Sequence, residues 1–147
     1  MGEVLYRELE HTADIAVEII AATREELFAE ALGAFTDIIS ERGKVEERLA
    51  RDFALAGPHL DLLLVDWLDE LVYAFEVEEL LFRRADVRLT ELTGGGGGRL
   101  AFAARAWGET LDPRRHPIKV LIKGVTYHAL DITETAAGLR AQVIFDI

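Results

Sequence analysis

Cysteine is absent from this 147-residue sequence, and Ser40 is its only serine. Without cysteine there are no disulfides, no thiolate zinc sites and no cysteine nucleophile. Any metal site is therefore expected to use oxygen donors, which hard divalent cations prefer. The chain also lacks a Gly-x-Ser-x-Gly elbow and a dinucleotide-binding glycine motif. These absences disfavour acyl-transfer and hydride-transfer enzymes.

Positive charge is also in short supply, because 16 Lys and Arg stand against 27 Asp and Glu, for a net charge of −11. Nucleic-acid-binding proteins usually carry a basic patch, and no basic run here is longer than a pair. We therefore expect no direct nucleic-acid binding, and favour a basic protein partner or a cation. No apolar run approaches the roughly 18 residues of a membrane span, and no signal-peptide core follows Met1. These features predict a cytoplasmic protein that does not enter a membrane.

The hydrophobic pattern predicts one domain over residues 1–147, with two amphipathic helices among short strands. A capping box at Thr23 and Glu26 begins the first helix, which is expected to continue to Ile39, and the second helix is expected over 60–76. Two-residue alternation predicts strands near 6–9, 15–19, 49–55, 87–89, 100–106, 118–122, 127–132 and 139–147.

The order of these elements predicts an α+β fold, in which two layers are formed by two helices packed on a mixed, mostly antiparallel sheet. A strand–helix–strand unit occurs twice and suggests an internal duplication. The glycines at 94–98 are followed by neither a lysine nor a helix. They are therefore expected to form a hairpin linker instead of a phosphate-binding loop.

Three polar clusters interrupt the apolar pattern, at 10–14, 123–128 and 146–147. In the last cluster the Asp146 carboxylate stands beside the terminal carboxylate of Ile147, and two anions so close repel. A hard metal ion that takes oxygens from Asp146, Ile147 and Asp14 would relieve this repulsion. Alternatively, the terminus is solvated and Asp146 simply points outward.

The other two clusters are equally open to two interpretations. His11 and Asp14 could form a metal pair or an acid/base pair, or they could cap a turn. Lys123 could have an ionic partner in Asp14 or Asp146, or it could share a solvated face with Lys119.

Four segments together resemble the archease family: 9–15 (LEHTADI), 64–71 (LVDWLDEL), 122–128 (IKGVTYH) and 143–147 (VIFDI). They occur in the family's order and span nearly the whole chain. Archeases are small acidic proteins that activate RtcB-type RNA ligases in tRNA splicing. They promote guanylylation of the ligase histidine, for which the ligase uses GTP, and they sustain multiple turnover. The resemblance therefore implies an activator of the ligase that is not itself an enzyme.

The resemblance also implies roles for individual residues. The family's metal ligands correspond to Asp14, Asp146 and the C-terminal Ile147, and its functional lysine corresponds to Lys123. His11, with Glu10, belongs to the same motif as Asp14 and is expected to support activation. The implied cofactor is a divalent ion, Ca²⁺ foremost, with Mn²⁺ or Mg²⁺ as alternatives.

The sequence departs from the family pattern at Glu8 and in the glycine loop at 94–98. Neither departure touches the expected ligands. Two other functions remain open: a metal-dependent hydrolase that uses Asp14, Asp146 and His11, and a general chaperone or interaction module.

Overall fold

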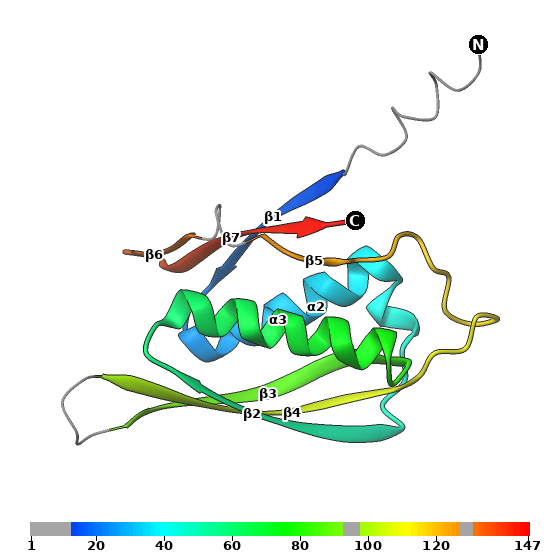
Figure 1. The fold of residues 1–147 in the computed structure, drawn as a ribbon, viewed down its shortest axis with the longest axis horizontal. Helices are drawn as coiled ribbons and strands as arrows, with labels where there is room; N and C mark the ends of the chain where they lie inside the picture. The colour runs from blue at the N-terminus through cyan, green and yellow to red at the C-terminus, as the bar shows by residue number, and fades with distance from the viewer. Residues whose placement is uncertain (1–12, 93–97, 127–130) are drawn as a thin grey trace, which may run out of the picture.

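The structure is a computed structural model that describes residues 13–92, 98–126 and 131–147. Within these ranges, two helices lie between two antiparallel β-sheets (Figure 1). The strand predicted at 6–9, residues Glu10 and His11, and most of the glycine loop lie outside the described residues. No helix in the described ranges is long and apolar enough to cross a membrane.

The first sheet contains β1 (Asp14–Ala21), β5 (Gly124–Val125), β6 (Asp131–Thr135) and β7 (Gly138–Asp146). Its strands are ordered β1-β7-β5, and β6 also pairs with β7. All these pairings are antiparallel. The central strand is β7, because β1, β5 and β6 each pair with it. Side chains on β7 alternate between buried and more exposed positions, which is the pattern of a strand with one face on the core.

The second sheet contains β2 (Leu49–Gly57), β3 (Leu80–Leu92) and β4 (Arg99–Thr110), in the order β2-β4-β3. The central strand β4 is antiparallel to both neighbours, so β2 and β3 run in the same direction. Figure 1 shows this sheet below the helices and the first sheet above them.

The helices are α2 (Arg24–Ile39) and α3 (Leu60–Glu76), and a short 3-10 turn, η1 (Arg42–Lys44), follows α2. The Thr23 hydroxyl caps α2 by accepting a hydrogen bond from the Glu26 N–H at 3.1 Å, as the capping box predicts. Both helices bury broad arcs instead of narrow stripes. A helix that touches layers on both sides needs such an arc.

Aromatic contacts connect the helices to both sheets. Phe28 of α2 and Trp67 of α3 pack against Phe102 of β4, with ring centroids 5.5 and 4.9 Å apart. On the other side, Phe35 of α2 meets Phe145 of β7 at 6.3 Å. The core is therefore continuous through the helix layer, because the same helices pack on both sheets.

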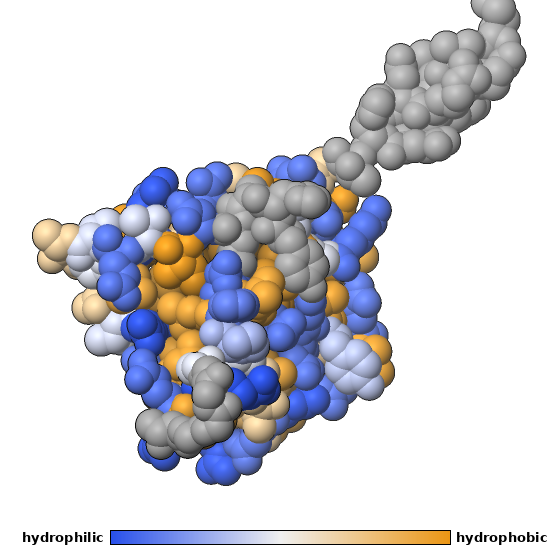
Figure 2. All heavy atoms as spheres, turned by 60° about the vertical axis from the view of Figure 1, so that its left-hand side comes forward, coloured by the Kyte–Doolittle hydropathy of each residue, from blue (hydrophilic) through white to orange (hydrophobic). Residues whose placement is uncertain are grey.

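At one end of the sandwich, the start of α3 lies near β6. Figure 2 brings this end forward and shows apolar atoms between the polar side chains of the surrounding elements. A cavity of about 380 Å³ lies there between the start of α3 and β6, and Leu60 and Ile132 contribute its apolar lining.

The predicted α+β class is confirmed, with two helices packed against antiparallel strands. The strands divide between two sheets that enclose the helices, whereas the sequence predicted a single sheet. The strand predicted at 118–122 is wrong, because residues 111–123 form neither helix nor strand. Pro117 has no N–H to donate, and the Lys119 N–H donates to the Ile39 carbonyl at the end of α2. The segment thus crosses from the second sheet to the first.

Position 108 of β4 requires glycine, because β3 and β4 approach each other closely there. Beside it the pairing of β3 with β4 shifts register between Phe82 and Arg84, which marks a β-bulge. A Cβ atom at position 108 would lie only 1.9 Å from the Leu81 carbonyl oxygen. Only glycine allows the two backbones to come so close.

We predict that Gly108→Ala lowers the free energy of unfolding by about 2 kcal/mol, because β3 must move away from β4. Urea denaturation followed by circular dichroism measures the change. Gly43→Ala is the matched control, because a Cβ there meets nothing within 4 Å. Equal stabilities for the two variants would contradict the predicted backbone clash.

Candidate functional site

The candidate site is a pair of carboxylates at one end of the first sheet. Asp14 begins β1 and Asp146 ends β7, and the antiparallel register places them directly opposite each other. Neighbouring residues on the same strands, Ile15 and Phe145, point to the helices, with Phe145 fully buried. Because side chains alternate along a strand, both aspartates lie on the outer face of the sheet.

Gly124 of β5 continues this row on the other side of Asp146. Among the residues that the structure describes, a Cβ built at Gly124 would meet nothing within 4 Å, so none of them crowds this position. The Thr126 hydroxyl donates a hydrogen bond to Asp146 Oδ1 at 2.9 Å. This bond orients one carboxylate oxygen of Asp146, and the other oxygen can face Asp14 or a ligand.

The two carboxylates affect each other electrostatically. The pKa of Asp14 is raised above its ordinary value, first by loss of contact with water, then by hydrogen bonding to Asp146 and by repulsion from its charge. A proton or a cation between the two groups would remove the repulsion.

Two backbone hydrogen bonds bring the other expected site residues to the same place. The Lys123 N–H donates to the Asp146 carbonyl at 2.7 Å, and the Ile147 N–H donates to the Ala13 carbonyl at 3.1 Å. The side chain of Lys123 is exposed. The structure thus brings Asp14, Asp146, Ile147 and Lys123 together.

Of the three donors predicted from the sequence, the structure places two carboxylates opposite each other, those of Asp14 and Asp146, and Ile147 follows Asp146 directly. Within the described ranges, no group of three or more His, Asp or Glu side chains could hold a metal ion. An ion at this position would therefore need main-chain oxygens, or ligands from elsewhere, in addition to the two side chains.

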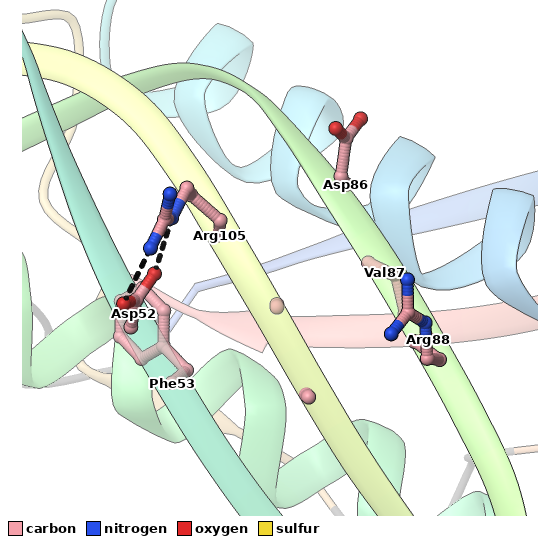
Figure 3. Close-up of a pocket in the computed structure, with 8 residues that line it drawn as sticks. Asp52, Phe53, Asp86, Val87, Arg88 and Arg105 are labelled. Carbon is pink, nitrogen blue, oxygen red and sulfur yellow. Dashed lines mark hydrogen bonds and ion pairs between the residues drawn. The ribbon is translucent and has the colours of Figure 1, made fainter.

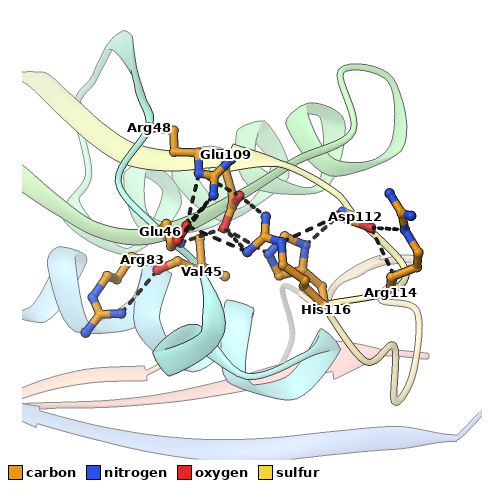
Figure 4. Close-up of polar contacts among 9 residues, drawn as sticks. Val45, Glu46, Arg48, Arg83, Glu109, Asp112, Arg114 and His116 are labelled. Carbon is orange, nitrogen blue, oxygen red and sulfur yellow. Dashed lines mark hydrogen bonds and ion pairs between the residues drawn. The ribbon is translucent and has the colours of Figure 1, made fainter.

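A second polar cluster, at the end of β4, was not predicted from the sequence. Its centre is Glu109, whose side chain is 3% exposed. Glu109 Oε2 accepts hydrogen bonds from the Glu46 N–H at 2.6 Å and from Arg115 at 3.2 Å, and lies 3.0 Å from His116 Nε2. Its Oε1 pairs with the same Arg115 guanidinium (Figure 4). The sequence carries no signal for this contact, because Glu109 and His116 are brought together only by the turn between them.

The hydrogen bonds of this cluster establish its protonation states. The pKa of Glu109 is lowered to about 2, chiefly by its hydrogen bonds with Arg115, so Glu109 is ionised. The Asp112 N–H donates to His116 Nδ1 at 2.8 Å. A backbone N–H can only donate, so Nδ1 is unprotonated and Nε2 carries the hydrogen that bonds Glu109.

A cavity of about 470 Å³ lies on the outer face of the second sheet, away from the carboxylate pair. Figure 3 shows that its charged groups come from three neighbouring strands and that Arg105 pairs with Asp52. Arg105 of β4 forms two hydrogen bonds with Asp52 of β2, at 2.7 and 3.0 Å. This pairing leaves the two groups engaged with each other, so we do not assign the candidate site to this cavity.

Comparisons with known proteins agree with this fold. The sequence matches the model of the archease protein family (MTH1598/TM1083) over residues 6–147. Proteins named archease from Methanosarcina barkeri and Methanosarcina acetivorans are each 42% identical to it, over 97% of this chain and 95% of theirs. The solution structure of Methanobacterium thermoautotrophicum protein 1598 is similar with a TM-score of 0.74 and 25% identity, covering 94% of this chain and 95% of that one.

The fold and the site define a small α+β protein that presents a carboxylate pair on the outer face of one sheet. The family match covers nearly the whole sequence, and the two Methanosarcina relatives align with 97% of this chain. This chain belongs to the archease family.

The lowered pKa of Glu109 predicts a pH-dependent contribution to stability. Its folded pKa of about 2 lies below the ordinary 4.5, so the stabilisation is present above pH 4.5 and is lost as the pH falls towards 2. We expect Glu109→Gln to lower the free energy of unfolding at pH 7 by about 2 kcal/mol, because charged hydrogen bonds are lost. Urea denaturation across this pH range should show the difference from the wild type shrinking as the pH falls.

The exposed Glu134→Gln variant is the control, and it should show no such trend. A Glu109→Gln deficit that stayed constant from pH 7 to pH 2 would contradict the assignment of an ionised, hydrogen-bonded Glu109.

Proposed function

We propose that this chain activates an RtcB-type RNA ligase in tRNA splicing. In this proposal it acts in the cytoplasm, where it promotes the guanylylation of the ligase with GTP and sustains multiple turnover. Membership of the archease family supports the proposal, because activation of such a ligase is what the resemblance of its motifs implies.

The observation that carries the proposal is the convergence of separate segments on one end of a sheet. Asp14 comes from the first described strand and Asp146 from the last, Ile147 directly follows that strand, and Lys123 comes from the segment between the sheets. Register and backbone hydrogen bonds join all four positions. Residues far apart in sequence therefore meet here.

The residues that would hold a divalent ion are Asp14, Asp146 and the terminal carboxylate of Ile147. Ca²⁺, Mn²⁺ and Mg²⁺ all accept such oxygen ligands, and a bound ion would supply positive charge at the point of contact with the ligase. Thr126 orients the Asp146 carboxylate, and none of the described residues crowds Gly124 beside it. Lys123 adjoins these residues through its backbone, and its side chain is exposed.

The partner is a protein and not the RNA itself. This chain carries a net charge of −11, whereas an enzyme that binds RNA is positive around its RNA channel. Opposite charges at the rim of an interface speed association and orient the partners. Activation requires only that the chain bind one state of the ligase more tightly than another, so no reaction need occur on this chain.

The first test measures stimulation of the ligase from the same organism. Single-turnover guanylylation with GTP and multiple-turnover ligation are followed with the wild type, Asp14→Asn, Asp146→Asn and Lys123→Met. We expect each substitution to lower the stimulated rate on the order of tenfold or more, because each removes a group at the contact with the ligase.

Two matched controls accompany these variants. Lys119→Met removes an exposed lysine from the same segment, and Asp86→Asn removes an exposed aspartate from the second sheet. Both should stimulate like the wild type. Turnover of a phosphate ester by the chain alone would favour a hydrolase instead, and equal stimulation by every variant would favour a general interaction module.

The second test measures metal binding directly by isothermal titration calorimetry with Ca²⁺, Mn²⁺ and Mg²⁺. We expect Asp14→Asn and Asp146→Asn to weaken binding on the order of tenfold or more, because an oxygen anion is lost from the site. Two glycines appended after Ile147 should also weaken binding, since they move the terminal carboxylate. Affinity unchanged by the appended residues would show that Ile147 is not a ligand.

A further inference from the structure

The segment 111–123 is the longest described connection without helix or strand, and Lys123 stands at its end. Only two of its side chains are buried: His116 at 0% exposure and Ile122 at 2%. Ile118 and Leu121, by contrast, are 41% and 58% exposed. The path of this segment therefore depends on a few attachment points instead of on a continuous core.

His116 is attached to the rest of the protein through both ring nitrogens. Nδ1 accepts the Asp112 N–H and so closes the turn at 112–116, which the His116 N–H also closes by donating to the Asp112 carbonyl at 2.7 Å. Nε2 donates to Glu109 on β4 at 3.0 Å. One bond shapes the turn, and the other fastens the turn to the second sheet.

Glu109 joins β4 to two other parts of the chain through one carboxylate. It accepts the Glu46 N–H ahead of β2, and it binds the neighbouring Arg115 and His116 side chains of the turn. Figure 4 shows Glu46 and His116 on either side of Glu109. Burying an ionised carboxylate is costly, and well-packed apolar residues often give equal or greater stability. A buried ionic cluster of this kind is better suited to imposing one geometry than to adding stability.

We propose that Glu109 and His116 are positioning residues that hold the segment 111–123 in the path that delivers Lys123 to Asp146. The path is continuous in the structure. From the His116 turn it passes Pro117, reaches the Lys119 N–H bond to the Ile39 carbonyl at 2.8 Å, and ends at buried Ile122 and the Lys123 N–H bond to Asp146 at 2.7 Å. This placement matters for function only if Lys123 has the role given to it in the proposed function.

Amide hydrogen exchange tests the placement without the ligase. His116→Leu removes both ring hydrogen bonds, including the one that joins the turn to the buried Glu109. We expect the Lys119 and Lys123 amides of this variant to exchange on the order of tenfold or more faster than in the wild type, with amides in the middle of β1 unchanged. His116→Gln should restore protection, because its amide oxygen can accept the Asp112 N–H and its amide nitrogen can donate to Glu109.

Trp67→Phe is the control for a general loss of stability. It removes another buried hydrogen bond, from Trp67 Nε1 to the Phe28 carbonyl at 2.9 Å, far from the segment. If His116→Leu exchanged at Lys119 and Lys123 no faster than Trp67→Phe, the positioning role would be overturned. The same result in Glu109→Gln would overturn it even if His116→Leu failed to fold.

Ligase stimulation separates this inference from the proposed function. If His116→Leu shows faster amide exchange and lower maximal stimulation at saturating protein, and His116→Gln reverses both changes, the result supports the positioning role and the proposed function. Faster exchange with full stimulation supports the placement by Glu109 and His116 and contradicts a functional role for Lys123.

Discussion

The antiparallel register of β1 with β7 is the constraint on which the candidate site depends. It sets Asp14 opposite Asp146, and the same pairing puts buried Phe145 opposite Ile15 on the helix side. A slip of one residue would move every side chain of a strand to the other face, so the carboxylates would enter the core and apolar groups would face water. The packing of Phe145 against Phe35 of α2 therefore maintains the site, although neither ring touches it.

The helix layer connects this register to the rest of the molecule. Trp67 and Phe28 pack on the second sheet, and Phe35 packs on the first, so each sheet is placed relative to the other through α2 and α3. Only the segment 111–123 runs from β4 to β5 around this layer. The segment is attached through His116 to Glu109 of the second sheet and through Lys119 to the end of α2. The position of the segment where it enters the first sheet therefore depends on contacts with the second sheet.

Local patterns predicted most of the elements but not their tertiary arrangement. The period of apolar residues indicated α3 over 60–76, and the capping box indicated the start of α2. The alternation of apolar and charged residues at 118–122 wrongly predicted a strand, because an extended segment with no partner strand shows the same pattern of side chains. The pairing of Asp14 with Asp146 depends on register, and the contact of Glu109 with His116 depends on a turn. Neither contact can be deduced from spacing. Charge repulsion made a shared role of Asp14 and Asp146 one of two alternatives, and the family resemblance favoured it.

The carboxylate pair stands on the water side of its sheet, with bare glycine backbone next to it at position 124. Because both side chains point away from the core, substitutions of Asp14 and Asp146 leave the interior packing intact. Variants at positions 14 and 146 would consequently stay folded, and a loss of activity in them would be a loss of the proposed contact and not of the structure.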